Sequence, residues 1–159
     1  MTARGGRLVF AMSIVGVLSC SEIRGHSMKG GEKCLYMPTI EECQSAAASL
    51  ITDECLRDCV IKHCKEGYAF CGEKVMATCS KLTREHPEGE TGGYVYPGTQ
   101  TCERPKPYVN WCQIGQSPPC QALSMVHERA HACGWDHGDG MGVPGDDKGR
   151  IIGCKSPSR

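Results

Sequence analysis

Three of the six histidines of this chain lie within eleven residues, in the segment HERAHACGWDH at positions 127–137. His127 and His131 are four residues apart, so on a helix their imidazoles project from one face, about one turn from each other. Two imidazoles in this arrangement can bind one divalent ion, and zinc takes nitrogen ligands in a four-coordinate site. Glu128 is placed to contact a metal-bound water rather than the metal. The segment therefore predicts a zinc site with a carboxylate beside it.

The third ligand must come from outside the helix. Gly134 can adopt the positive φ that side chains resist, so the chain can turn back and bring His137 to the same metal. A fourth position would then stay open for water. Asp136 or Asp139 could serve instead in an aspartate-liganded variant. Two other interpretations stay open: histidines at a helix border that hydrogen-bond the core, and a closed zinc site that is purely architectural.

The segment resembles the metzincin zinc-peptidase signature H-E-x-x-H-x-x-G-x-x-H at every fixed position, over these eleven residues alone. The resemblance implies that His127, His131 and His137 bind zinc and that Glu128 is the general base and acid. It implies peptide hydrolysis as the reaction, with a protein or peptide as the substrate. In this mechanism the metal activates a water and polarises the scissile carbonyl.

The chain departs from the family pattern at three points. Metzincins place a methionine turn beneath the metal, and the only methionine after the motif, Met141, follows His137 more closely than usual. A loop position is the alternative interpretation of Met141. No tyrosine follows His137, so a transition-state tyrosine would have to be Tyr94, Tyr96 or Tyr108. The family also has several strands before the active helix, whereas this sequence predicts two.

The motif requires a helix, and residues 117–134 predict one. Ser117 is an N-cap residue, Pro118 suits the first helical position and Gly134 suits the end. An apolar stripe predicts that one side of this helix packs on the core. The stripe consists of Ala122, Leu123, Val126, Ala130 and Cys133.

The preceding residues predict helices first and strands later. Residues 37–66 indicate one long helix or two shorter ones broken near Thr52 and Asp53, with a capping box at Thr39 and Glu42. A further helical segment covers about 71–82, and strands are predicted within 93–98 and 107–114. The fold class predicted is α+β: a small disulfide-rich, zincin-like domain with a helical N-terminal half and a few short strands before the active-site helix.

The cysteines predict how such a domain is held together. The chain of 159 residues has thirteen cysteines but only two phenylalanines and two tryptophans, so cross-links must supplement a small core. The twelve from Cys34 to Cys154 could form six disulfides. A zinc-thiolate module at Cys55, Cys59 and Cys64 is the less favoured alternative, since paired CxxC knuckles are missing.

Two further sets of polar residues are expected at the surface. A calcium site at Asp136, Asp139, Asp146 and Asp147 does not fit the spacing of an EF-hand, so a solvated turn is expected. His63 and His86 are expected to be surface residues rather than further ligands. Basic and acidic residues balance at 18 each, which gives no indication of a nucleic-acid partner.

The N-terminus predicts export. Arg4 and Arg7 precede an apolar run at residues 8–18 that is too short to span a bilayer, so residues 1–19 are interpreted as a signal peptide. The tetrapeptide VLSC at 17–20 resembles a lipobox, in which Cys20 would be lipidated; ordinary cleavage is the alternative. Residues 20–33 are expected to be a flexible linker and 34–159 a single Cys-rich, metallopeptidase-like domain. The protein would be secreted or a cell-envelope lipoprotein, and any membrane contact would come through that lipid.

Two functions fit these observations. The first is an exported zinc-dependent peptidase that uses Glu128 and the three histidines. The second is a non-catalytic, disulfide-rich exported binding module whose histidines are structural or store metal. They differ at Glu128, because only hydrolysis needs this carboxylate. Substrate specificity and oligomeric state are not encoded in any motif of the sequence.

Overall fold

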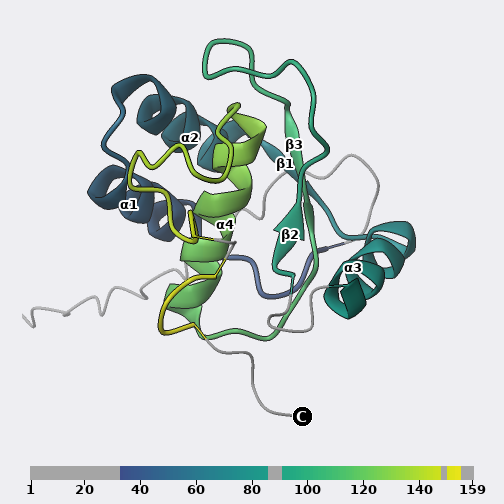
Figure 1. Cartoon of the computed structure of the whole chain (residues 1–159). Coiled ribbons are helices and arrows are strands. Elements are labelled where there is room, and N and C mark those ends of the chain that lie inside the picture. Colours follow the sequence, from purple (N-terminus) through teal and green to yellow (C-terminus); the bar gives the residue numbers. More distant parts are fainter. Residues whose placement is uncertain (1–32, 86–90, 148–149, 155–159) are drawn as a thin grey trace, which may run out of the picture.

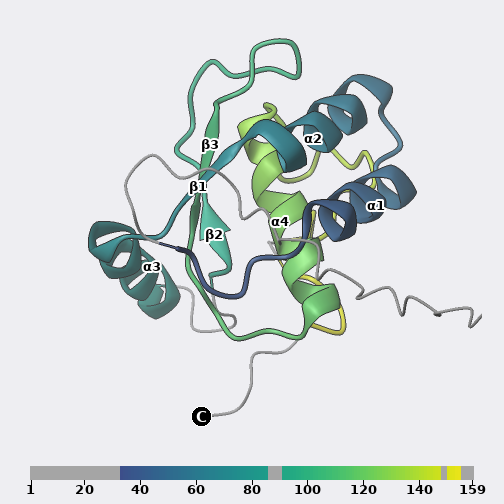
Figure 2. The same cartoon turned by 180° about the vertical axis from the view of Figure 1, so that it is seen from behind.

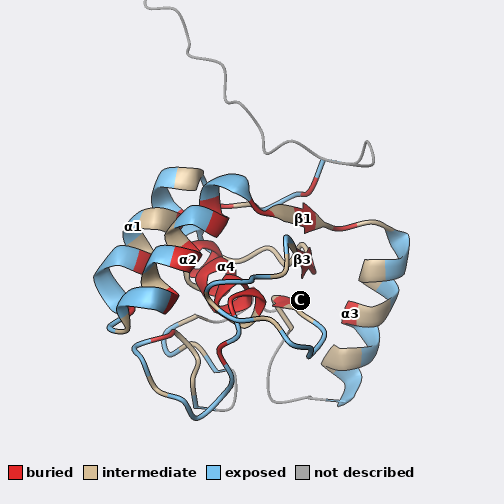
Figure 3. Cartoon of the chain, turned by 90° about the horizontal axis from the view of Figure 1, so that it is seen from above, coloured by how far each residue is buried: buried red, intermediate tan, exposed pale blue. Residues whose placement is uncertain are grey.

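The computed structural model describes residues 33–85, 91–147 and 150–154. The expected signal peptide, Cys20 and nearly all of the expected linker lie outside these residues. In the described residues, four helices and a three-stranded sheet form a small α+β domain. Helix α4 (Pro118–Ala132) lies in the middle, with α1 (Ile40–Leu50) and α2 (Glu54–Glu66) on one side and the sheet on the other (Figures 1 and 2). Helix α3 (Glu73–Glu85) lies beyond the sheet (Figure 3).

The helical N-terminal half is confirmed, and it breaks where the sequence indicated. Thr39 and Glu42 form the predicted capping box at the start of α1, each side chain binding the other's backbone N–H. Helix α1 ends at Leu50, and Asp53 caps α2 by accepting a hydrogen bond from the backbone N–H of Leu56 at 2.9 Å. The third helix occupies the predicted region but begins and ends slightly later.

The sheet has the order β1-β3-β2, with β3 (Tyr108–Trp111) in the middle. Strand β2 (Gly93–Tyr94) pairs with it antiparallel and β1 (Tyr68–Phe70) pairs parallel. The two predicted strands are therefore present but shorter than predicted. Strand β1 was not predicted, because three residues between two helices are too few to show the alternation of a strand.

Helix α4 is buried on more sides than its apolar stripe predicted. Eleven of its fifteen residues are buried, including His127, Glu128 and Arg129. The prediction of one buried side was wrong because α1 and α2 pack on one face while β2 and β3 pack on another. His127 and His131 are therefore on the most enclosed of the described helices.

All twelve cysteines from Cys34 to Cys154 are paired, as predicted, so the zinc-thiolate alternative was wrong. The six disulfides are Cys34–Cys71, Cys43–Cys64, Cys55–Cys102, Cys59–Cys133, Cys79–Cys112 and Cys120–Cys154. So many disulfides indicate an oxidising, extracytoplasmic environment. None of the helices in the described residues has the length and apolar character needed to cross a membrane.

Candidate metal centre

The three histidines of the motif come together at the C-terminal end of α4. His127 and His131 lie on the last turns of the helix and His137 on the loop that follows. One nitrogen of each ring lies within 4.8 Å of a nitrogen of the other two. The ring centroids are 4.8 to 5.0 Å apart. The three predicted ligands therefore form one cluster.

Gly134 allows the chain to turn back, as predicted. Its φ is +90°, a conformation that residues with a side chain rarely adopt. The backbone N–H of Trp135 then donates to the carbonyl of Ala130 at 3.0 Å, which closes the end of the helix. A Cβ at Gly134 would lie 2.5 Å from the carbonyl oxygen of Gln100 and 2.8 Å from Cα of Thr101. Glycine is thus required both by the turn and by the close approach of the 100–101 loop.

A backbone carbonyl fixes the orientation of each imidazole. Nδ1 of His127 donates to the carbonyl of Pro144 at 2.6 Å, and Nδ1 of His131 donates to that of Trp135 at 2.9 Å. Nδ1 of His137 lies 3.3 Å from the carbonyl of Asp146. Because a carbonyl only accepts, Nδ1 carries the proton, and in the neutral ring Nε2 is left with a lone pair. This orientation of imidazoles is typical of metal ligands.

The lone pairs of His127 and His131 point toward a shared position. Their Nε2 atoms are 3.2 Å apart. Two unprotonated nitrogens at this separation repel each other unless a proton or a cation lies between them. Tetrahedral zinc with bonds of about 2.0 Å places two ligand nitrogens about 3.3 Å apart. The residues therefore fit a zinc ion or a similar divalent cation.

Burial keeps the histidines on the helix in the neutral form that binds metal. Desolvation lowers the pKa of His127 to about 4, although its hydrogen bond to Pro144 acts in the opposite direction. Desolvation also lowers the pKa of His131, opposed by the hydrogen bond to Trp135. Protons therefore compete poorly for Nε2 of His127 and His131 near neutral pH.

Glu128 lies between α4 and the edge of the sheet. Its side chain is buried and packs against Gly93 of β2, where a Cβ would lie 2.6 Å from Cγ of Glu128. Among the described residues, none donates a hydrogen bond to this carboxylate. Desolvation raises the pKa of Glu128 to about 8. At neutral pH such a carboxyl is mostly protonated, so a cation beside it would be needed to favour the carboxylate that a general base requires.

Trp135 packs against the whole cluster, which the sequence did not predict. Its ring lies 4.8 to 5.4 Å from the rings of His127, His131 and His137. It is 2% exposed, and its indole N–H donates to the carbonyl of Gly140 at 3.3 Å. The only signal in the sequence is its position inside the motif, next to Gly134. Trp135 gives the three imidazoles a common apolar support.

The methionine and the tyrosines considered for the family pattern do not join the cluster. Met141 is 39% exposed, and its carbonyl accepts a hydrogen bond from the backbone of Thr52, so it is a loop residue. Side chains alternate along a strand, so Tyr94 points away from the face on which Gly93 meets Glu128. Figure 3 shows this other side of the sheet facing α3. The ring of Tyr96 lies 5.3 Å from that of Tyr94, and the ring of Tyr108 lies 5.2 Å from that of Phe70. Neither ring contact involves a residue of the motif.

His63 is a buried residue, so its assignment to the surface was wrong. It is 5% exposed, and its Nε2 donates to the carbonyl of Lys106 at 2.6 Å. Its Nδ1 accepts a hydrogen bond of 2.6 Å from the guanidinium of Arg129, which is itself 1% exposed. An exposed position was expected because His63 and His86 lie among cysteines and prolines in the sequence, but His63 lies on the face of α2 that meets α4. His86 lies outside the described residues.

Asp136 of the motif and the acidic residues that follow it form a turn, as expected. The carboxylate of Asp139 accepts a hydrogen bond from the backbone of Asp136 at 3.0 Å. That of Asp146 accepts from Gly138 and Gly140. Within the described part of the chain, no aspartate belongs to the group that could hold a metal with the histidines. The three-histidine set is therefore favoured over the aspartate-liganded variant.

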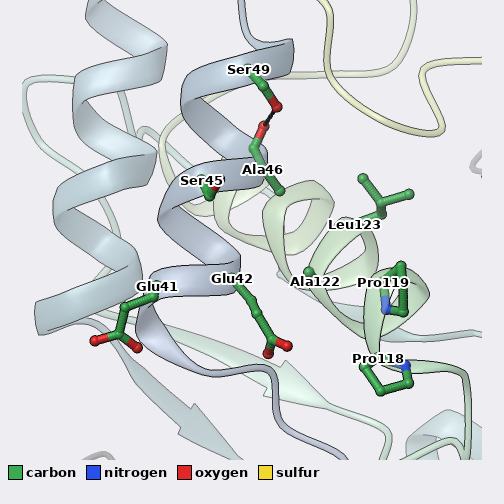
Figure 4. Close-up of a pocket in the computed structure, with 9 residues that line it drawn as sticks. All are labelled: Glu41, Glu42, Ser45, Ala46, Ser49, Pro118, Pro119, Ala122 and Leu123. Carbon is green, nitrogen blue, oxygen red and sulfur yellow. Dashed lines mark hydrogen bonds between the residues drawn. The ribbon is translucent and has the colours of Figure 1, made fainter.

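A surface groove of about 570 Å³ lies at the other end of α4 (Figure 4). Its lining comes from α1 and from the first residues of α4, Pro118 to Leu123, before the helix reaches His127. Glu42, on its rim, already caps α1. None of the three histidines lines the groove, which is therefore separate from the histidine cluster.

Comparisons with known proteins do not place the chain in a family. No protein-family model, curated protein or solved structure matches it. The candidate site therefore depends on its own residues and their geometry.

Proposed function

We propose that this protein is an exported zinc-dependent peptidase of the metzincin type, with His127, His131 and His137 as metal ligands and Glu128 as general base. The observation that carries the proposal is the 3.2 Å separation of the Nε2 atoms of His127 and His131, with His137 completing the cluster. The motif supports hydrolysis as the reaction, because a site that only holds metal has no need of Glu128.

Each group of the chain has a defined task in this reaction. Three Nε2 atoms would hold the ion, which supplies Lewis acidity and a water of lowered pKa when bound. Glu128 accepts a proton from the attacking water at a carboxylate oxygen and passes it to the nitrogen of the leaving amine. Burial raises the pKa of Glu128 to about 8, and a divalent cation nearby would lower it, which favours the ionised base.

The exposure of the ligands supports a catalytic site over an architectural one. Structural zinc sites are closed by four protein ligands, whereas catalytic sites use three and leave a position for water. Within the described residues only the three histidines form such a group, and His137 is exposed to solvent. The fourth position can therefore be reached from the side of His137.

One observation favours the alternative of a non-catalytic module. Glu128 is 6% exposed and His127 is 7% exposed, so a substrate must approach through a narrow opening. In this alternative the histidines would store metal or stabilise the loop, and the carboxylate would have no chemical task.

The test compares Glu128→Gln with the wild type. This change keeps the size of the side chain but removes the base, so it should retain one zinc per chain and lose hydrolysis of a labelled, denatured protein. Glu103→Gln is the control, because Glu103 is exposed and outside the motif. Equal hydrolysis by wild type and Glu128→Gln would contradict the peptidase, and a wild type that binds no zinc would contradict the metal centre.

A further inference from the structure

The loop after His137 is organised by one carboxylate. Oδ1 of Asp146 accepts a hydrogen bond from the backbone N–H of Gly138 at 2.7 Å, and Oδ2 accepts from that of Gly140 at 3.1 Å. Both glycines have positive φ, +94° and +74°. Two backbone donors on one carboxylate fix the path of the chain directly after the third histidine.

The backbone of the same segment contacts two of the three histidines. The carbonyl of Asp146 lies 3.3 Å from Nδ1 of His137, and the carbonyl of Pro144 accepts from Nδ1 of His127 at 2.6 Å. A shift of residues 144–146 would therefore move the acceptors of both rings. His131 is independent of this segment, because its Nδ1 donates to Trp135.

The start of the loop is anchored elsewhere. The carbonyl of Met141 accepts from the backbone of Thr52 at 2.8 Å, and the carbonyl of Gly140 accepts from the indole of Trp135. The carboxylate of Asp146 joins this anchored part to the carbonyls that orient the histidines. Asp147, the next residue, is exposed, and its side chain makes no hydrogen bond with the described residues.

We infer that Asp146 is a positioning residue of the proposed metal centre: its carboxylate holds the 138–146 loop so that backbone carbonyls orient His137 and His127 for one ion. This inference rests on the proposed function, since it concerns the same site. Outer partners of metal ligands set ligand orientation, and their loss weakens metal binding by about 10- to 100-fold.

The experiment measures zinc affinity in the disulfide-bonded protein by competition with a chelator. Asp146→Ala removes both acceptors and should raise the zinc dissociation constant by about 10- to 100-fold. Asp146→Asn keeps one acceptor and should give an intermediate value. Asp147→Ala, which removes the neighbouring charge alone, should bind like the wild type.

A second measurement, on metal-free protein, separates positioning from loss of the fold. The amides of Gly138 and Gly140 should exchange hydrogen faster in Asp146→Ala, while the amides of β3 keep wild-type rates. Tight zinc binding by the wild type with unchanged affinity in Asp146→Ala would overturn the role of Asp146 and leave the peptidase proposal intact. Equal losses in Asp146→Ala and Asp147→Ala would also overturn it, because charge alone would then explain the effect. A wild type without zinc affinity would overturn the metal centre itself.

Discussion

The guanidinium of Arg129 donates a 2.6 Å hydrogen bond to Nδ1 of His63, and this contact joins α2 to the helix that carries His127 and His131. Nε2 of His63 donates to the carbonyl of Lys106. His63 must be neutral to accept from Arg129, and a second positive charge on it would face the first. The contact therefore makes the packing of α4 sensitive to acid.

His63 should make the free energy of unfolding depend on pH. Burial and the charge of Arg129 lower its pKa to about 4 from an ordinary value of 6.5. The unfolded chain therefore binds the proton first, so this contribution is complete above pH 6.5 and is lost as the pH falls toward 4. The loss is about 3 kcal/mol. Urea unfolding of metal-free protein should show a smaller change between pH 6.5 and 4 in His63→Gln than in wild type.

His127 titrates over the same range in metal-free protein, so the control must separate it from His63. His127→Gln should lose its own part of the pH dependence and retain that of His63. A His63→Gln variant with the full pH dependence of the wild type would exclude His63 as the acid-sensitive group.

Local patterns in the sequence predicted the parts of the site that are close together in the chain. The spacing of His127 and His131 and the position of Gly134 were enough to place three imidazoles together. The burial of His63 was not predictable, because its partners Lys106 and Arg129 are distant in sequence. The partners of Trp135 are close in sequence, but no motif assigns a role to that position. Cysteine number predicted six disulfides, but the partners depend on tertiary packing.

Gly134→Ala should destabilise the protein more than the same change at Gly138. Both glycines have positive φ, but a Cβ at Gly134 would press on backbone atoms of residues 100–101, whereas a Cβ at Gly138 meets nothing within 4 Å. We expect a loss of about 1 kcal/mol from strain at Gly138 and about 2 to 4 kcal/mol from strain and overpacking at Gly134. Urea unfolding measures the free energy of unfolding of both variants. Equal losses would contradict the prediction, because they would show that the 100–101 loop can move to accommodate the new Cβ.

Trp135 should report metal binding through its fluorescence. It contacts all three imidazoles, whereas Trp111, the other tryptophan, lies on β3 and donates to the carbonyl of Leu35. Titration with Co²⁺ should quench the emission of Trp111→Phe and reach a plateau at one equivalent. The remaining emission of Trp135→Phe should change little. If Co²⁺ instead quenched the emission of Trp135→Phe strongly and left that of Trp111→Phe unchanged, the ion would lie away from the histidine cluster.

The sequence predicted the fold class and the helices better than it predicted the sheet and the burial of α4. Capping residues and helical periodicity are local, so α1, α2 and α4 began close to where the sequence indicated. Strand β1 is three residues long and is stabilised by parallel pairing with β3, far along the chain. The burial of α4 on several sides follows from this sheet, so its one-sided apolar stripe could not reveal it.

The disulfide Cys59–Cys133 should matter for metal binding beyond its effect on stability. Cys133 is the C-cap of α4, between His131 and Gly134, so this bond fixes the helix end from which the chain turns toward His137. Replacing both cysteines by alanine should lower the free energy of unfolding by about 2 to 4 kcal/mol and also weaken zinc binding. Replacing Cys79 and Cys112, which join α3 to the segment after β3, should cost similar stability but leave zinc affinity unchanged. Both variants lose one disulfide, so a comparison of their zinc dissociation constants separates the positioning of the helix end from the loss of stability. Equal dissociation constants would contradict a special role for Cys133.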